Sequence, residues 1–445
     1  MNKLKVGYLS LVKGSWINES LESQRAKALQ ALGSLDCEVV DCGKLVQNEK
    51  EAAEVAGAFS DAKVDCLLVH FITFSLGSIV PMAARKLNVP VIFWSEPEPP
   101  MEGGRLAANS FCATNMNAHA LWRMGMKYSF VYGTSETARA RLESQFKVIC
   151  CMKALNALRV GSVGGRVPGF YTSNFDELAL LEKFGIQTEK LTMLELIEDA
   201  RNILSGEQNS ASGIVDDLKN NGVAPEEINK LAALYAAFVN ASEKHNVDAF
   251  AVRCWPEFGD IYGIGVCAVL GLLTDNGIVA GCEGDVLGTV SMLMGEMLSG
   301  SKPFFCDLIS FDENENTGIA WHCGAAAPSL CREDCEPELC KHSIMDGGGA
   351  KGVVCEFPLK PGPVTMLRLG ERRDGGYRLF VAVGEAQKTE QLLKGNPLKI
   401  KFERDIKEMI GTIVDNGIEH HYALAHGNIA EELKLFSKWL DIEIL

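Results

Sequence analysis

The first third of the chain alternates short apolar segments with amphipathic segments, and this alternation restricts the fold more than any other feature. Strand-like runs at residues 5–12, 37–43, 64–71, 90–95 and 128–133 are separated by stretches with helical spacing, such as EAAEVAGAFSDA. Fully apolar strands separated by helices are typical of a parallel sheet that helices cover on both faces. We therefore expect an α/β domain with a parallel sheet at the N-terminus.

The pattern of strands and helices starts again further along the chain. The segment LRVGSVGGRVPGF (158–170) resembles the beginning of a second α/β unit, and strand-like runs return at 247–255 and 277–285. A nearly apolar helix is expected over 261–276, and another over 285–298 with Asp285 as its N-terminal cap. These features predict a second parallel sheet.

The pattern of expected secondary structure changes after about residue 300. Residues 347–386 alternate β-rich runs with Gly and Pro turns, which is typical of an antiparallel barrel or sandwich. The end is expected to return to helix, with ERDIKEMIGTIVDNG, HHYALAHGN and IAEELKLFSKWL. A chain of 445 residues is too long for one ordinary core. Together with the changes in sequence pattern, this length leads us to expect three domains, at 1–155, 156–300 and 301–445.

Composition excludes several classes of partner. The formal net charge of −15 and the lack of a Lys/Arg run argue against nucleic acid. No apolar run is long enough for a transmembrane helix, and the N-terminus does not resemble a signal peptide, so no membrane partner is expected. Most of the 15 cysteines lie within apolar runs, as free thiols do in a reducing cytoplasm, where we place the protein.

Two motifs invite a cofactor interpretation that their spacing does not favour. GSVGGR (161–166) lacks the GxGxxG spacing of a dinucleotide site, and no acid ends a clear second strand about 20 residues later. Cys331, Cys335 and Cys340 in CREDCEPELC suggest a zinc or iron–sulfur site, but the CxxC pair of such sites is missing. We interpret the first as a glycine-rich turn and the second as a solvent-facing loop.

Lone carboxylates follow two consecutive apolar runs. Glu283 stands where a strand gives way to a helix, and Asp307 lies 24 positions later (307 − 283), at the end of the next run. An unpaired buried carboxylate is costly, so such residues usually meet a cation, a donor or a metal. If the two runs were adjacent parallel strands, both acids would lie at one edge of the sheet, where ligands bind. Either acid alone could equally be structural.

Histidines are few, which makes their grouping informative. Three of the eight fall in HHYALAHG, as His420, His421 and His426, and His322 lies beside a turn. A neutral imidazole is a common ligand of divalent metals. We interpret His420 and His426 as structural residues. In this interpretation one histidine of the motif packs against the core and the others face solvent. His421 and His322 stay as candidates.

Three motifs together resemble the L-fucose isomerase/L-arabinose isomerase family, especially its fucose-isomerase-like members. They are GCEGD, then CDL, then HHYALAHGNIAEEL near the C-terminus. The resemblance covers nearly the whole chain and implies two Rossmann-like domains followed by a β-rich C-terminal domain. It implies that Glu283, Asp307 and His421 bind a divalent metal, typically Mn²⁺, and that the two acids form the acid/base pair. His322 would be the counterpart of a further ligand in arabinose-isomerase relatives.

The resemblance implies an aldose–ketose isomerase of a monosaccharide that works through a cis-enediol. Two carboxylates and one imidazole suit manganese, cobalt or magnesium, and a metal stabilises charge on two adjacent substrate oxygens. The expected sugar resembles L-fucose or D-arabinose; an anionic hexose such as sulfoquinovose is the alternative. A non-catalytic sugar sensor or a nucleotide-dependent oxidoreductase is less consistent with these motifs. The family's hexamers imply a homo-oligomer, a hexamer or a trimer, with sites near subunit interfaces.

Residues that follow the strand at 247–255 are candidates for contacts with the sugar. RCWPEFGDIYG supplies Arg253, Trp255 and Asp260 to the same expected edge of the sheet. An indole can stack on the apolar face of a sugar, although a buried structural Trp is an equal alternative.

Overall fold

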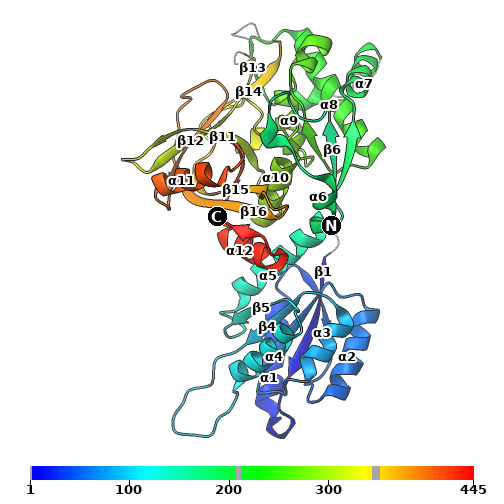
Figure 1. Ribbon diagram of the computed structural model, residues 1–445, viewed down its shortest axis with the longest axis vertical. Coiled ribbons are helices and arrows are strands. Elements are labelled where there is room, and N and C mark those ends of the chain that lie inside the picture. The colour runs from blue at the N-terminus through cyan, green and yellow to red at the C-terminus, as the bar shows by residue number, and fades with distance from the viewer. Residues whose placement is uncertain (1–2, 207–211, 343–350) are drawn as a thin grey trace. The chain divides into compact units, whose positions relative to one another are not determined.

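The computed structural model describes residues 3–206, 212–342 and 351–445 (Figure 1). The chain divides into two compact units, Met1–Cys150 and Cys151–Leu445. The first unit contains one parallel sheet, and the second contains another parallel sheet and a closed antiparallel barrel. The fold class expected from the sequence is therefore confirmed. The division into domains at 155/156 and 300/301 stays a prediction.

The N-terminal unit is built on a five-stranded parallel sheet with the strand order β2-β1-β3-β4-β5. Each of the five expected strands is present. The strands are β1 (Leu4–Leu11), β2 (Cys37–Asp41), β3 (Cys66–Phe71), β4 (Val91–Ser95) and β5 (Tyr128–Tyr132). The helices are α1 (Glu19–Leu32), α2 (Glu49–Asp61), α3 (Ile79–Leu87), α4 (Ser110–Arg123) and α5 (Arg139–Leu155), within which the boundary between the units falls.

Helices cover both faces of this sheet, as the apolar strands predict. Successive side chains of a strand point to opposite faces. Leu9 of β1 packs in one apolar cluster with Phe59 of α2, and this cluster also includes residues of α3 and α4. Leu68 of β3 packs in the other cluster with Leu32 of α1 and Leu142 of α5. Full burial of one such side chain stabilises the fold by about 1.5–3 kcal/mol.

The second unit begins with a four-stranded parallel sheet of order β10-β9-β6-β7. Its strands are β6 (Arg159–Val163), β7 (Gln187–Leu191), β9 (Ala249–Val252) and β10 (Ala280–Gly281). The helices of this part are α6 (Glu177–Phe184), α7 (Met193–Ser205), α8 (Pro225–His245), α9 (Cys267–Asp275) and α10 (Val286–Ser299). The predicted cap of α10 is confirmed, because the Asp285 side chain accepts a hydrogen bond from the amide of Gly288.

The apolar helix α9 is shorter than the sequence predicts. It begins at Cys267 rather than near residue 261, and Phe258–Tyr262 form a separate π-helical turn, η4. Gly263 has a φ of +97°, which a right-handed helix cannot accommodate, and so it separates the two segments.

The rest of the second unit is dominated by a six-stranded antiparallel barrel. The strand order is β15-β18-β11-β12-β17-β16, and pairing between β15 and β16 closes the ring. Its strands are β11 (Phe304–Asp312), β12 (Thr317–His322), β15 (Gly362–Glu371), β16 (Tyr377–Ala386), β17 (Asn396–Phe402) and β18 (His421–His426). The accompanying elements are α11 (Ile406–Asn416), α12 (Ala430–Leu440) and β19 (Glu443–Ile444), which pairs with β16. The barrel alternative is thus the correct one.

The structure corrects the expectation that HHYALAHGN is helical. Residues 421–426 form β18, which pairs with β11 on one side and with β15 on the other. Ala and Leu favour helices in isolation, but pairing with two neighbouring strands outweighs a preference of a few tenths of a kcal/mol per residue, roughly. Of the β-rich segment expected at 347–386, residues 347–350 lie outside the described residues.

Short elements complete the second unit. A small sheet joins β8 (Lys219–Asn221), β13 (Glu338–Lys341) and β14 (Val353–Glu356). The 3₁₀ segments of the chain are η1 (Gly14–Trp16), η2 (Tyr171–Ser173), η3 (Ser212–Val215) and η5 (Pro328–Leu330). Among the described residues, no helix has both the length and the apolar character needed to span a membrane.

The interpretation of the Cys331, Cys335 and Cys340 segment as a solvent-facing loop is partly wrong. Cys340 is buried on β13, where it pairs with β14, and the other two cysteines are half-buried. Within the described part of the chain, no group of three or more His, Cys, Asp or Glu residues with ligand atoms within 4.8 Å of one another includes any of these cysteines.

Candidate active site

Glu283 lies in a tight turn between β10 and α10. Its φ is +60°, in the left-handed region that non-glycine residues seldom adopt. Gly284 follows with a φ of +70°, and a Cβ there would stand 2.1 Å from the carbonyl oxygen of Gly165. The turn therefore requires glycine at 284 and holds Glu283 in a strained conformation, which is a common property of functional sites.

Asp307 and His421 lie directly opposite each other on neighbouring strands of the barrel. Asp307 of β11 is the register partner of His421 at the beginning of β18. The two acids therefore do not come from adjacent parallel strands, as the sequence suggested: Glu283 follows the parallel sheet, whereas Asp307 belongs to the antiparallel barrel. The apolar run before Asp307 does not reveal which sheet its strand will join.

Of the three residues expected to bind a metal, His421 lies near both acids, whereas the group whose ligand atoms all lie within 4.8 Å of one another consists of Glu283, His420 and His421. The Nε2 atom of His421 lies 3.1 Å from Oε2 of Glu283 and 3.9 Å from Oδ1 of Asp307. Oδ1 of Asp307 is buried and makes no hydrogen bond, and Nε2 of His421 is buried with the carboxylate of Glu283 as its near neighbour. Buried polar atoms of this kind usually have a partner, and atoms without one require an explanation.

This donor set fits a hard divalent cation. For a six-coordinate ion with bonds of about 2.1 Å, adjacent donors lie about 3 Å apart and opposite donors about 4 Å apart. The distances from His421 to the two carboxylates fall within this range. Carboxylates and an imidazole are ligands that Mg²⁺, Mn²⁺ and Co²⁺ accept.

Asp285 orients the ring of His421 from the opposite side. Its Oδ2 lies 3.0 Å from Nδ1 of His421, so Nε2 is left to face the other two acids. Asp285 also receives two hydrogen bonds from Arg368, of 2.6 and 3.1 Å, and both side chains are 1% exposed. A carboxylate that holds the second nitrogen of a histidine fixes its tautomer and orientation.

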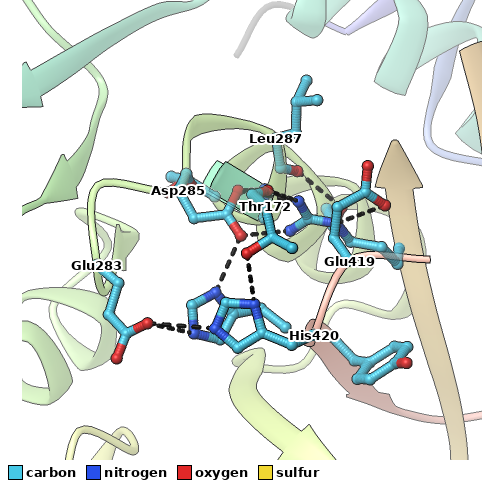
Figure 2. A network of polar contacts seen from close by, with 12 residues as sticks. Thr172, Glu283, Asp285, Leu287, Glu419 and His420 are labelled. Carbon is cyan, nitrogen blue, oxygen red and sulfur yellow. Dashed lines mark hydrogen bonds and ion pairs between the residues drawn. The ribbon is translucent and has the colours of Figure 1, made fainter. Parts of the chain in front are cut away.

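A second histidine contacts Glu283, which the sequence interpretation missed. Nε2 of His420 lies 3.3 Å from Oε2 of Glu283, and its Nδ1 lies 2.8 Å from the hydroxyl of Thr172. Figure 2 shows the carboxylates of Glu283 and Asp285 approaching the imidazole rings from two sides. The adjacent pair of histidines was the only signal of this contact in the sequence, and the structural interpretation of His420 stays a prediction.

Arg368 and Glu419 were also missed, because nothing in their local sequence marks them. Nε of Arg368 lies 3.7 Å from Oε2 of Glu419, which also pairs with Arg378 at 3.5 Å. The guanidinium of Arg368 therefore lies between Asp285 and Glu419. His426, by contrast, is half-buried and its Nε2 lies 2.9 Å from the carbonyl oxygen of Lys360, which agrees with a structural role.

The other candidates lie around this cluster. His322 is buried on β12 with its ring centroid 6.1 Å from that of His421, and its Nδ1 lies 3.4 Å from Sγ of Cys323. Trp255 and Asp260 line a pocket that also includes Glu283. Arg253 forms an ion pair with Glu257. The ligand role of His322 stays a prediction, as do the three sugar contacts.

Burial and charge act against each other in this cluster. Burial alone would lower the pKa of His421, but hydrogen bonds and charges from Asp285 and Glu283 raise that pKa to about 9. Burial would raise the pKa of Glu283, but hydrogen bonds from His420 and His421 lower it to about 2. The charge of Arg368 outweighs burial and holds the pKa of Asp285 well below its usual value. Glu283 and Asp285 are ionised at neutral pH, and a bound proton or metal ion can balance their negative charge.

Comparisons with known proteins identify the family of the chain. Residues 7–156 match the family model described as fucose/sulfoquinovose isomerase, N-terminal domain, and residues 320–445 match L-fucose isomerase, C-terminal domain. A sulfoquinovose isomerase of Alkalicoccus urumqiensis is 30% identical over 388 residues, 86% of each chain.

Two further relatives with the same name match over the full length. The sulfoquinovose isomerase of Priestia aryabhattai is 29% identical over 450 residues, which cover 100% of this chain and 99% of the relative. That of Clostridium sp. (strain MSTE9) is 28% identical over 452 residues, with the same two shares. This chain therefore belongs to the fucose isomerase-like family and is an aldose–ketose isomerase.

Proposed function

We propose that the chain is a metal-dependent isomerase of an anionic hexose, sulfoquinovose, and that Glu283, Asp307 and His421 hold the metal. The observation that carries the metal site is the approach of the carboxylates of Glu283 and Asp307 to the buried Nε2 of His421, with Oδ1 of Asp307 buried and without a hydrogen bond. The substrate proposal is supported by the name of relatives that match the chain over its full length. The names of these relatives favour sulfoquinovose, the alternative substrate expected from the sequence, over a sugar that resembles L-fucose or D-arabinose.

The proposed ligands leave positions for the substrate. Glu283, His420 and His421 have ligand atoms within 4.8 Å of one another, and Asp307 approaches His421 at 3.9 Å. A six-coordinate ion held by the proposed ligands would take its remaining bonds from water or sugar. A bound cation would act as a Lewis acid and stabilise the negative charge that develops on two adjacent sugar oxygens. We keep Mn²⁺ as the expected ion, with Co²⁺ or Mg²⁺ as alternatives.

The same two carboxylates are the proposed acid/base pair. Isomerisation moves a proton between C2 and C1 through a cis-enediol, and a positioned carboxylate can accept and return that proton. Glu283 is ionised at neutral pH, as a base must be, and its turn holds it rigidly beside the pocket. Which of Glu283 and Asp307 takes the C2 proton stays open in this proposal.

The pocket beside Glu283 suits a sugar. Trp255 offers an aromatic face, and Asp260 offers a hydrogen-bond acceptor. Lys351 also lines this pocket and lies 3.2 Å from Asp260, so it offers a positive charge to an anionic substrate. The homo-oligomer, a hexamer or a trimer with sites near its interfaces, and the cytoplasmic location remain predictions.

The test is turnover after removal and return of the metal. Chelated protein should be inactive, and Mn²⁺, Co²⁺ or Mg²⁺ should restore activity with sulfoquinovose more effectively than with L-fucose, D-arabinose or L-arabinose. If chelation leaves turnover unchanged, the metal proposal is wrong. If a neutral sugar is the preferred substrate, the metal proposal survives and the sulfoquinovose assignment is wrong.

A further inference from the structure

A second group of metal-binding side chains lies near the candidate active site and is chemically different from it. It consists of Cys267 at the N-terminus of α9, Cys323 directly after β12 and His342 directly after β13. One ligand atom of each lies within 4.8 Å of the ligand atoms of the other two. The group therefore offers two sulfur atoms and one nitrogen at a single point.

The spacing of the two thiols is close to that of a tetrahedral metal site. Sγ of Cys267 lies 3.5 Å from Sγ of Cys323. Two thiolates bound to one zinc ion at about 2.3 Å with a tetrahedral angle are about 3.8 Å apart. A shift of a few tenths of an ångström, roughly, would adapt the observed pair to zinc.

The backbone holds the three residues in place. The amide of His342 donates to the carbonyl oxygen of Gly352 at 2.9 Å, and Gly352 forms a bridge with Gly265, two residues before Cys267. One turn further along α9, a Cβ at Gly271 would stand 2.4 Å from the carbonyl oxygen of Ala326. The absence of a side chain at Gly271 therefore allows α9 to pack directly on the segment that follows Cys323.

The group is accessible from a pocket. Cys267, Cys323 and His342 line the same pocket as Glu283 and Trp255. Catalytic zinc ions are commonly held by three protein ligands, two Cys and one His among the known sets, with the fourth position open. Here the fourth position would face the pocket and take water or a substrate oxygen.

We propose that Cys267, Cys323 and His342 form a second cation site, selective for thiophilic ions such as Zn²⁺, in the wall of the pocket beside Glu283. Sulfur ligands select zinc, whereas the carboxylates of Glu283 and Asp307 suit harder ions. The two sites therefore differ in the ion that each prefers. This proposal does not depend on the proposed substrate.

The first test uses Co²⁺ as a spectroscopic probe. It is added to protein from which a chelator has removed metal ions and in which the cysteines are fully reduced. Sulfur-bound Co²⁺ gives a near-ultraviolet charge-transfer band, which the carboxylate and imidazole ligands of the other site do not produce. Wild type and Glu283→Gln should both show the band, and Cys267→Ser and Cys323→Ser should lose it. Cys340→Ser is the matched control, because Cys340 packs in the same small apolar cluster as Cys267 but lies outside the ligand group. A band that persists in both ligand variants would overturn the proposal.

The second test needs no variant. Zn²⁺ should slow alkylation of Cys267 and Cys323 in the folded wild-type protein, as read by mass spectrometry, while the exposed Cys112 serves as the internal reference. Equal alkylation rates with and without Zn²⁺ would also overturn the proposal. His342→Gln should weaken Zn²⁺ binding by at least about tenfold, since even loss of an outer-shell partner costs roughly 10–100-fold.

Discussion

Two buried histidines, one in each unit, meet carboxylates and yet differ in their charge. His70 of β3 lies 2.8 Å from the hydroxyl of Tyr8 and 3.1 Å from Oε1 of Glu96, and it stacks on Trp94 with ring centroids 3.9 Å apart. Burial outweighs its single carboxylate and lowers the pKa of His70. His421 is as deeply buried, but two carboxylates contact it and raise its pKa to about 9.

The comparison teaches that burial alone does not decide the charge of a histidine. One acid does not compensate for desolvation in the N-terminal unit, whereas two acids, one of them anchored by Arg368, do so in the second unit. The first arrangement is a neutral hydrogen-bonded core. The second concentrates negative charge, as a cation site must, and four predictions test this difference.

The largest expected effect is on catalysis. Glu283→Gln removes a proposed ligand and base, so turnover of the metal-loaded enzyme should fall by roughly 10²–10⁴-fold. Glu296→Gln is the matched control, since this glutamate of α10 pairs with Lys302 instead of the histidines. Steady-state kinetics at saturating metal measures both variants. Near-normal turnover by Glu283→Gln would remove this residue from the proposed chemistry.

The next effect concerns the acid that orients His421. Asp285→Asn leaves Arg368 buried without its charged partner, which should cost about 3–5 kcal/mol of stability. Loss of the carboxylate behind a metal-binding histidine should also weaken metal binding by roughly 10–100-fold. Urea denaturation of the metal-free protein and a metal titration measure the two effects. Unchanged stability would mean that Arg368 finds another partner.

The pH dependence of stability should have opposite signs at the two histidines of the metal-free protein. The folded pKa of His421 is raised from 6.5 to about 9, so its stabilisation is complete below pH 6.5 and is lost as pH rises through about 9. The folded pKa of His70 is lowered, so its contribution is present above pH 6.5 and is lost as pH falls.

Comparison of wild type with His421→Gln and with His70→Gln tests this difference. The stability difference from His421→Gln, on the order of 3 kcal/mol at most, should shrink toward alkaline pH. The difference from His70→Gln should shrink toward acidic pH. Urea midpoints measured across the pH range provide the readout. Two differences that change in the same direction would show that the two sites do not differ in the way proposed.

The smallest effect is expected at Glu96. Glu96→Gln keeps a hydrogen-bond acceptor for the neutral ring of His70, so the change should cost only about 1 kcal/mol. Hydrogen exchange of β3 peptides is a local measurement of this change. A loss as large as that of Asp285→Asn would mean that His70 is charged in the folded protein.

Local sequence was sufficient for much of the fold. The strands β1 to β5, the strands β6, β9 and β10 of the second parallel sheet and the cap of α10 could be predicted, because apolar runs, helical spacing and capping residues are short-range signals. The strand β7 of that sheet was not predicted, because its segment was read as part of a helical region. The strand β18 could not be predicted, because its residues favour a helix and only pairing with β11 and β15 makes them a strand.

The candidate site divides in the same way. Sequence patterns place Glu283, Asp307 and His421 in motifs whose chemistry suits a metal. The three-dimensional structure was needed to show that Asp307 and His421 face each other across two barrel strands, and that Arg368 and Asp285 support the ring from behind. Strand register and buried charge pairs depend on residues that are distant in the chain, so local patterns carry no signal for them.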